Sequence, residues 1–195
     1  FIARACLFPS IHPDFENNQL VYFAYTKRSD DGESGTMAAA RGRFTGRRLV
    51  DVEDIFVANI WSERSGHFGS RIAFDGKGYV YISTGDMSLV NPEAVPREEN
   101  PAQDISNHAG TINRLHDDGR IPADNPFVNT PGAMPEIWSY GHRNVQGLTF
   151  NPDNGELWAI EHGPQGGDEV NHILPGRNYG WPVIGYGINT GGGKI

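Results

Sequence analysis

The stretch FDGKGYVYISTGD, residues Phe74–Asp86, shows the pattern that decides the fold. An apolar residue leads into a tight turn, and an apolar segment follows that ends in small and polar residues. Asp favours such turns because its side chain bonds the nearby backbone, and Gly favours them because it tolerates a positive φ. The pattern therefore predicts a turn followed by a β-strand.

Two further stretches repeat this pattern, HPDFENNQLVYFAYT (His12–Thr26) and FNPDNGELWAIEHG (Phe150–Gly163). When the three are aligned, Leu20, Tyr79 and Leu157 take equivalent places. Repeats at this somewhat irregular spacing are typical of β-propeller blades joined by loops of variable length. Unrelated hairpins of a β-sandwich are the alternative, and the repetition favours the propeller.

Other segments extend the prediction of an all-β fold. Four more strand candidates are Met37–Phe44, Leu49–Ile60, Gly110–Leu115 and Glu136–Tyr140. The sequence HDDGR (His116–Arg120) predicts a hairpin turn, whereas Met87–Asn107 and Ile121–Pro135 are expected to form long polar loops. The chain shows no long amphipathic helix and no separate linker, so we expect a single domain over residues 1–195.

Composition limits the classes of function. The formal net charge of −8 argues against a nucleic-acid partner, which would need a basic face. No apolar run reaches the length of a membrane span. Cys6 is the single cysteine, so neither an intrachain disulfide nor a cysteine-based zinc site is expected.

Polar side chains gather at the ends of the repeated units. The motif SGHFGSR places His67 beside glycines, and YGHRNVQG places Arg143, Asn144 and Gln146 together. Loops at blade ends converge on the axis of a propeller, so residues of different blades can meet around one ligand. We therefore expect His67, Arg143 and the loop around Gly163 to converge on one cavity.

Each candidate also has a purely structural interpretation. His67 could be a hydrogen-bonded structural histidine, Asp86 only a turn residue, and Arg143 a surface ion-pair former. Asp168 and Glu169 could form a solvated acidic face, as adjacent carboxylates usually do. Residue spacing alone leaves both interpretations open.

The stretch EHGPQGGDEVNHILPGRNYGWP, residues Glu161–Pro182, reads as a loop, since it is too polar for a core and too punctuated for a helix. Its glycine and proline residues leave backbone carbonyls free, and calcium binds such oxygens together with carboxylates. Glu169 supplies negative charge near the carbonyls of Gly163 and Pro164. The chain contains no HExxH motif and no GxGxxG after a strand, so neither that zinc site nor a Rossmann unit is supported.

Four longer stretches resemble the soluble quinoprotein aldose dehydrogenases, also called the glucose/sorbosone dehydrogenase family. They are HFGSRIAFDGKGYVYISTGD, AGTINRLHDDGRIPADNPF, EIWSYGHRNVQGLTFNP and EHGPQGGDEVNHILPGRNYGWPVIGYGIN. The resemblance implies a six-bladed β-propeller, of which this chain supplies roughly the first three to four blades. It also implies oxidation of the anomeric hydroxyl of an aldose to a lactone. The hydride would pass to pyrroloquinoline quinone (PQQ), held with calcium on the propeller axis.

The resemblance assigns roles around the quinone. His67 matches the family's general base, a neutral imidazole within reach of the sugar hydroxyl. Asp86 matches the acid that orients this histidine. Arg143 and Asn144 match quinone-binding residues, and a fixed cation there stabilises the charge that develops as hydride arrives. Gln146 matches a further cofactor contact.

The resemblance also implies two calcium sites. Gly163 and Pro164 match the backbone carbonyls that hold the cofactor's calcium, which acts as a Lewis acid on the quinone. Glu169 and Tyr179 match a second, structural calcium site.

The sequence departs from the family in several places. The start FIARACLFPSI contains no glutamine that would contact the cofactor, and Thr190 stands where some members have tyrosine. Phe1–Arg4 shows no signal peptide and no initiator Met. Family chains are also longer, and their later blades contribute basic residues to the quinone carboxylates. We therefore expect a longer protein, or a second chain that completes the propeller.

Two functions compete at this point. The first is a PQQ-dependent dehydrogenase, periplasmic or secreted as in the family, with an aldose substrate and an external electron acceptor. The second is a non-catalytic, calcium-stabilised propeller fragment that binds sugar or a partner. His67 and Arg143 favour the first, and the missing blades favour the second. Substrate-facing loops vary among propellers, so the sequence does not name the sugar.

Overall fold

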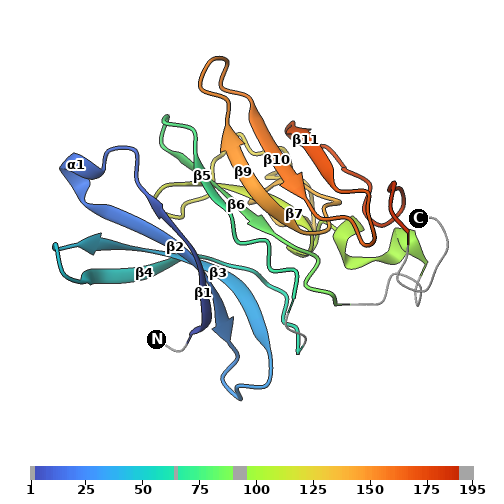
Figure 1. Cartoon of the computed structure of the whole chain (residues 1–195), viewed down its shortest axis with the longest axis horizontal. Coiled ribbons are helices and arrows are strands. Elements are labelled where there is room, and N and C mark those ends of the chain that lie inside the picture. Colours follow the sequence, from blue (N-terminus) through green and yellow to red (C-terminus); the bar gives the residue numbers. More distant parts are fainter. Residues whose placement is uncertain (1–2, 64–65, 90–95, 189–195) are drawn as a thin grey trace.

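Antiparallel sheets make up nearly all of the regular structure, as seen in a computed structural model that describes residues 3–63, 66–89 and 96–188 (Figure 1). The first sheet has the order β1-β2-β3-β4, with bounds Ala3–Ile11, Leu20–Arg28, Gly35–Phe44 and Leu49–Val57. The second has the order β5-β6-β7-β8, with bounds Ile72–Phe74, Tyr79–Thr84, Thr111–His116 and Ile137–Ser139. The third has the order β11-β10-β9, with bounds Glu169–Ile173, Leu157–Glu161 and Val145–Phe150. The short helical elements are α1 (Phe15–Asn18), η1 (Arg97–Glu99) and η2 (Pro101–Gln103).

The three repeated stretches occupy equivalent places in the three sheets. Strands β2, β6 and β10 begin at Leu20, Tyr79 and Leu157, and each is the second strand of its sheet along the chain. In the first stretch the turn is the single helical turn α1, closed by Gln19 with a left-handed φ of 57°. The alignment made from the sequence is confirmed, because turn chemistry marks the same corner of each sheet.

The hairpin predicted at HDDGR forms only in part. The turn is present, with the backbone N–H of His116 donating to the carbonyl of Arg120 at 2.8 Å. The next strand along the chain to pair with β7 is β8, however, which follows only after a long loop. Asn125 pins this loop by donating its Nδ2 to the carbonyls of Arg114 and Pro135, each at 2.9 Å. The prediction of a tight hairpin was wrong because the loop lies between the turn and the returning strand.

The segment expected as a loop from Glu161 to Pro182 also contains a strand. Strand β11 pairs antiparallel with β10, with Glu161 opposite Glu169. Only its flanks, residues 162–168 and 174–182, are irregular. The prediction of a continuous loop was therefore wrong for β11, whose backbone hydrogen bonds are satisfied by β10 despite its polar sequence.

Two hydrophobic clusters hold the sheets together, and β6 contributes to both. Val80 and Ile82 belong to a cluster that includes Tyr22 of the first sheet. Tyr81 belongs to a second cluster that includes Leu157 of the third sheet. Side chains alternate between the two faces of a strand, so β6 is buried on both faces. This double burial explains its continuous apolar run.

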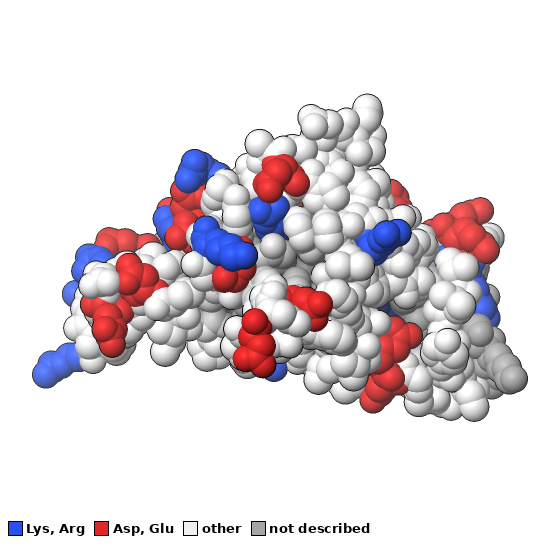
Figure 2. All heavy atoms as spheres, turned by 90° about the horizontal axis from the view of Figure 1, so that it is seen from above, with Lys and Arg blue, Asp and Glu red and all other residues white. Residues whose placement is uncertain are grey.

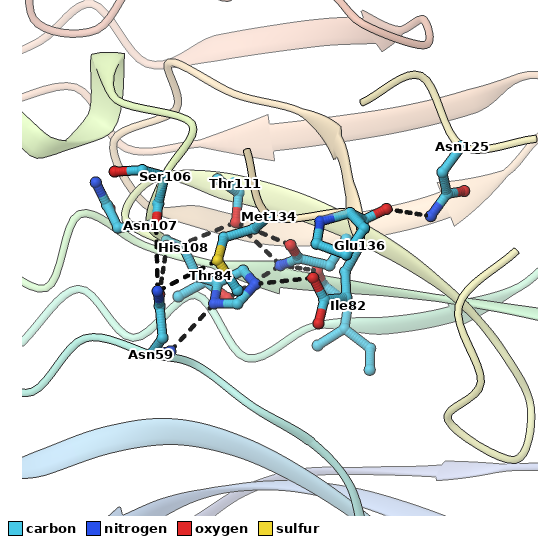
Figure 3. Close-up of polar contacts among 12 residues, drawn as sticks. Asn59, Ile82, Thr84, Ser106, Asn107, His108, Thr111, Asn125, Met134 and Glu136 are labelled. Atoms are coloured by element: carbon cyan, nitrogen blue, oxygen red, sulfur yellow. Dashed lines mark hydrogen bonds and ion pairs between the residues drawn. The ribbon is translucent and has the colours of Figure 1, made fainter. Parts of the chain in front are cut away.

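A polar network around the buried His108 joins the end of the first sheet to the second (Figure 3). Asn59 donates its backbone N–H to His108 Nδ1 at 3.1 Å and its Nδ2 to the carbonyl of Ser106 at 3.2 Å. The Nε2 of His108 lies 3.6 Å from Glu136 Oε2, which is an ion-pair distance and too long for a hydrogen bond. Phe56 packs edge-on against the imidazole, with 5.0 Å between the ring centroids. We call this group the His108 network.

Charged side chains of both signs are scattered over the face shown in Figure 2. Exposed ion pairs elsewhere in the chain include Lys27 with Asp54 and Arg43 with Asp51, each at 2.8 Å. Such exposed pairs contribute little stability. Among the described residues, no helix has the length and apolar character needed to cross a membrane.

Candidate active site

His67 and Asp86 form a close pair between two loops of the second sheet. The Nδ1 of His67 lies 2.7 Å from Asp86 Oδ1, and the histidine side chain is 25% exposed. The carboxylate favours the tautomer in which Nδ1 carries the proton, which leaves Nε2 able to accept one. The pair therefore has the chemistry of a general base held by an acid.

The backbone that carries His67 has an unusual conformation. His67 and Ser70 have positive φ values of 52° and 76°, and Gly69 between them has 65°. A Cβ on Gly69 would lie 2.8 Å from the backbone nitrogen of Gly85, so no larger residue fits. Non-glycine residues with left-handed φ are uncommon and concentrate at functional sites. The loop therefore holds the imidazole at a stored conformational cost.

Asn144 and Gln146 fasten this loop to the third sheet. Asn144 Oδ1 accepts the backbone N–H of Gly69 at 3.1 Å, and it also accepts from Gln146 Nε2 at 2.9 Å. Gln146 Nε2 further donates to the carbonyl of Gly69 at 3.3 Å. Both residues, which were expected to contact the cofactor, thus bond the backbone beside His67.

The Arg143 guanidinium is held by backbone carbonyls. Its Nη1 donates to the carbonyls of His162 and Gly163, at 3.1 Å each. Its Nε is buried without a hydrogen-bond partner, and Arg143 forms no ion pair with any described residue. The Cζ atom lies 5.2 Å from the centroid of the Trp181 ring. Burial lowers the pKa of Arg143, although the charges of Asp86, Glu161 and Asp168 oppose that shift.

A buried chain of side chains lies next to Arg143. Glu161 Oε2 accepts the backbone N–H of Arg143 at 2.6 Å, and its Oε1 lies 2.9 Å from His142 Nδ1. Ser139 Oγ lies 3.0 Å from His142 Nε2. Burial raises the pKa of Glu161, but His142 and the neighbouring backbone N–H groups outweigh it, so the pKa is lowered overall. The order resembles a Ser–His–acid triad, yet Ser139 and His142 are both 0% exposed and have no access to substrate.

The expected calcium residues divide into two groups. Gly163 and Pro164 line one cavity with Arg143, Glu169 and Trp181. The Tyr179 hydroxyl instead donates to the carbonyl of His172 at 2.6 Å and accepts the N–H of Leu174 at 2.8 Å. Within the described ranges, no group of three or more His, Cys, Asp or Glu side chains is placed to hold a metal. Any calcium site here would rest mainly on backbone carbonyls, and it stays a prediction.

His67 and Arg143 line two different cavities, so the prediction that both converge on one cavity with the Gly163 loop was wrong. His67 lines one cavity together with Asn144 and Gln146, whereas Arg143 lines the cavity of Gly163 and Pro164. Asp86 joins them, because it bonds His67 and its backbone N–H donates to the carbonyl of Arg143 at 2.8 Å. Thr190, noted as a departure from the family, lies outside the described residues.

Two residues of this region were not anticipated. Glu161 and Trp181 stand in the sequence as an ordinary strand end and an ordinary aromatic. Glu161 finds its partners 18 and 19 residues earlier, in Arg143 and His142, whereas Trp181 and Asp86 are 95 residues apart. The signal in the sequence is that Glu161 lies two residues before the GP pair and that Trp181 is part of the WP pair.

The sequence of this chain is similar to those of known proteins. The family model described as Glucose / Sorbosone dehydrogenase matches residues 9–195. Aldose sugar dehydrogenase YliI of Escherichia coli (strain K12) is 42% identical over 185 residues, which cover 94% of this chain and 47% of that protein. Quinoprotein glucose dehydrogenase B of Acinetobacter calcoaceticus is 34% identical over 199 residues, which cover 93% of this chain and 41% of that protein. The chain thus spans about half the length of the curated relatives it matches.

Solved structures give the same result. The soluble aldose sugar dehydrogenase from Escherichia coli in the apo-form matches with a TM-score of 0.88 at 40% identity, over 97% of this chain and 52% of that chain. The PQQ-bound form of aldose sugar dehydrogenase from Streptomyces coelicolor matches with a TM-score of 0.74 at 30% identity, over 97% and 51%. These matches confirm the prediction of an all-β, propeller-type fold of which the chain covers part.

Proposed function

Because this chain belongs to the glucose/sorbosone dehydrogenase family, we propose that it forms part of a quinoprotein oxidoreductase that converts aldoses to lactones. Similar proteins are named aldose sugar and glucose dehydrogenases, and one similar structure is of a PQQ-bound form. This chain would take part through Arg143, His67 and the loop around Gly163.

The state of Arg143 is the observation that carries the proposal. Its guanidinium is partly buried, its Nε has no partner, and no described carboxylate pairs with it. A buried cation in this state is stabilised by an anionic, planar ligand that accepts hydrogen bonds. The adjacent Trp181 ring adds an apolar, aromatic wall. PQQ, a planar quinone with carboxylates, fits these groups.

Proton transfer is assigned to His67. PQQ, when bound, supplies the acceptor for the hydride that leaves the anomeric carbon. His67 accepts the proton of the anomeric hydroxyl at Nε2, because Nδ1 is engaged with Asp86. Asp86 keeps the imidazole in the required tautomer and stabilises the imidazolium that forms. Arg143 offsets the negative charge that develops near its guanidinium.

Calcium belongs to the same proposal. The carbonyls of Gly163 and Pro164 would hold the ion of the cofactor site, which supplies a Lewis acid there. The Gly163 carbonyl accepts one hydrogen bond from Arg143, and a carbonyl oxygen has a second lone pair to offer. Glu169 and Tyr179 would serve a second, structural ion, although Glu169 lines the cavity of Gly163 and Pro164 and the Tyr179 hydroxyl is hydrogen-bonded to His172 and Leu174. Asn144 and Gln146 would contact the cofactor from the His67 side.

The remaining assignments concern the whole protein. We propose that residues 1–195 form one partial propeller domain, which further blades complete, from a longer polypeptide or a second chain. The substrate is an aldose, an external acceptor takes the electrons, and the protein acts in the periplasm or outside the cell.

PQQ binding tests the proposal directly. The chain would be titrated with PQQ in the presence of calcium, with quenching of tryptophan fluorescence as the readout, and then assayed for dye reduction with several aldoses. Arg143→Ala should weaken PQQ binding about tenfold or more, since it removes a charge-assisted contact. Arg120→Ala is the matched control, because Arg120 is exposed and its ion pair among the described residues is with Asp118.

Two outcomes would count against the proposal. Equal PQQ affinity in the wild type and both variants would reject Arg143 as a cofactor ligand. Calcium-dependent stability without any PQQ binding would favour the non-catalytic fragment instead.

A further inference from the structure

Trp181 contacts both charged groups of the site. Its indole Nε1 donates a hydrogen bond to Asp86 Oδ2 at 2.9 Å, and the contact is buried. Its ring centroid lies 5.2 Å from the Cζ atom of Arg143. Trp181 therefore links the acid that holds His67 to the cation that would face the cofactor.

The hydrogen bonds of Asp86 divide between its two oxygens. Oδ1 lies 2.7 Å from His67 Nδ1 and accepts the backbone N–H of Ser88 at 2.9 Å. Oδ2 accepts from Trp181. With donors on both oxygens, the carboxylate cannot rotate about its Cβ–Cγ bond without losing one of them. The indole therefore fixes which oxygen faces the imidazole.

Trp181 is itself held by contacts that need no ligand. Its backbone N–H donates to the carbonyl of Gly141 at 2.8 Å, and its carbonyl accepts from Gln103 Nε2 at 2.6 Å. The side chain is almost completely buried. The loop after β11 thus presents the indole from a fixed position, in the manner of a preorganised support.

We propose that Trp181 is a positioning residue that fixes the Asp86 carboxylate and, through it, the tautomer and orientation of His67. The indole also forms the aromatic wall beside Arg143, so one side chain sets the geometry of both partners. The effect on turnover rests on the proposed function, whereas the effect on His67 does not. A support of this kind acts through the residues it holds and leaves the substrate itself untouched.

A second tryptophan provides the matched control. Trp138 also lies near an arginine, with the Cζ atom of Arg114 at 4.9 Å from its ring centroid. Its Nε1 is buried and has no hydrogen-bond partner. Replacement by phenylalanine therefore removes an indole N–H in both positions, but only at position 181 does that N–H hold a carboxylate.

Nitrogen-15 NMR of the imidazoles, without cofactor or substrate, tests the proposal. The measurement is made at about pH 8.5, where an ordinary imidazole is neutral. In the wild type and in Trp138→Phe, the His67 signals should report the Nδ1–H tautomer. In Trp181→Phe they should move toward a mixture of both tautomers. In the PQQ-loaded protein, Trp181→Phe should lower kcat on the order of tenfold, with KM changed by less than about twofold.

A second variant guards against a misfolded protein. Asp86→Asn replaces the acceptor and should shift the indole N–H signal of Trp181 alone among the four tryptophans. Unchanged His67 signals in folded Trp181→Phe would overturn the proposal, and so would an indole signal that ignores Asp86→Asn. A wild type without quinone-dependent turnover would reject the proposed function, and the His67 signals would still decide this inference.

Discussion

His67 and His108 each face a carboxylate, and the two pairs differ in ways that separate a reactive histidine from a structural one. The distance to the carboxylate is 2.7 Å for His67 and 3.6 Å for His108. The side chain of His67 is 25% exposed, whereas that of His108 is 1% exposed. His108 uses Nδ1 to accept from Asn59 and turns Nε2 toward Glu136. The Nε2 of His67 makes no hydrogen bond within the described residues, so it is available to a substrate.

The backbone adds to this contrast. His67 lies in a left-handed loop that Asn144 and Gln146 fasten, whereas His108 lies in the network that joins two sheets (Figure 3). Strained backbone conformations concentrate at functional sites, whereas fully hydrogen-bonded polar networks stabilise the fold. The surroundings of a histidine, more than the presence of a carboxylate, thus indicate its role.

Alanine at position 67 should produce the largest effect. In the PQQ-loaded protein, His67→Ala should lower kcat by roughly 10²–10⁴-fold, about 3–5 kcal/mol of barrier, because general-base catalysis is lost. PQQ affinity and melting temperature should change little. Steady-state kinetics beside thermal unfolding measures both. A stable, PQQ-saturated variant with near wild-type kcat would show that His67 is not the base.

Alanine at position 108 should do the opposite. His108→Ala leaves a cavity and an unpaired N–H at Asn59, and we expect a loss of about 3 kcal/mol in the free energy of unfolding. Turnover per folded molecule should stay the same. Urea unfolding with a parallel assay at matched folded fraction makes the measurement. Loss of kcat without loss of stability would remove the distinction between the two pairs.

Calcium should affect the region of Gly163 and Glu169 more than the His108 network. At a calcium concentration about ten times its Kd, binding to the folded state alone adds about 1.4 kcal/mol of stability. Removal of calcium by a chelator should therefore lower the melting temperature, and Glu169→Gln should reduce that difference. Glu53→Gln, on an exposed face of β4, serves as the control. Equal melting temperatures in chelator and in excess calcium would refute a calcium site.

The pH dependence of the His108 network should be the smallest effect. Burial raises the pKa of Glu136, but the facing His108 outweighs it and lowers the pKa overall. A lowered carboxyl pKa in the folded state stabilises the protein above the usual pKa of glutamate, and the contribution is lost as pH falls through the folded value. Glu136→Gln should therefore lose stability relative to the wild type near neutral pH and approach it in acid. Unfolding free energies of the two proteins that run parallel across acid pH would contradict this.

The sequence predicted the parts of the fold that depend on local chemistry. The starts of β2, β6 and β10 followed from turn residues next to apolar runs, as did the pairing of His67 with Asp86 from the family motifs. Strand β11 was missed because its partner strand, rather than its own composition, satisfies its backbone. The link from Trp181 to Asp86 depends on how the sheets pack, and no local pattern encodes a contact between loops so far apart.

The double burial of β6 has a consequence for cooperativity. Because Val80 and Ile82 serve one hydrophobic cluster and Tyr81 serves the other, neither cluster can loosen without withdrawing support from its neighbour. Elements coupled through a shared interface tend to unfold together, and substitutions on the two faces of such a strand need not have additive effects. Strand β6, which leads directly into Asp86, thus couples the described sheets. A substitution that loosens packing on one face of β6 should also affect the histidine loop and the sheet on its other face.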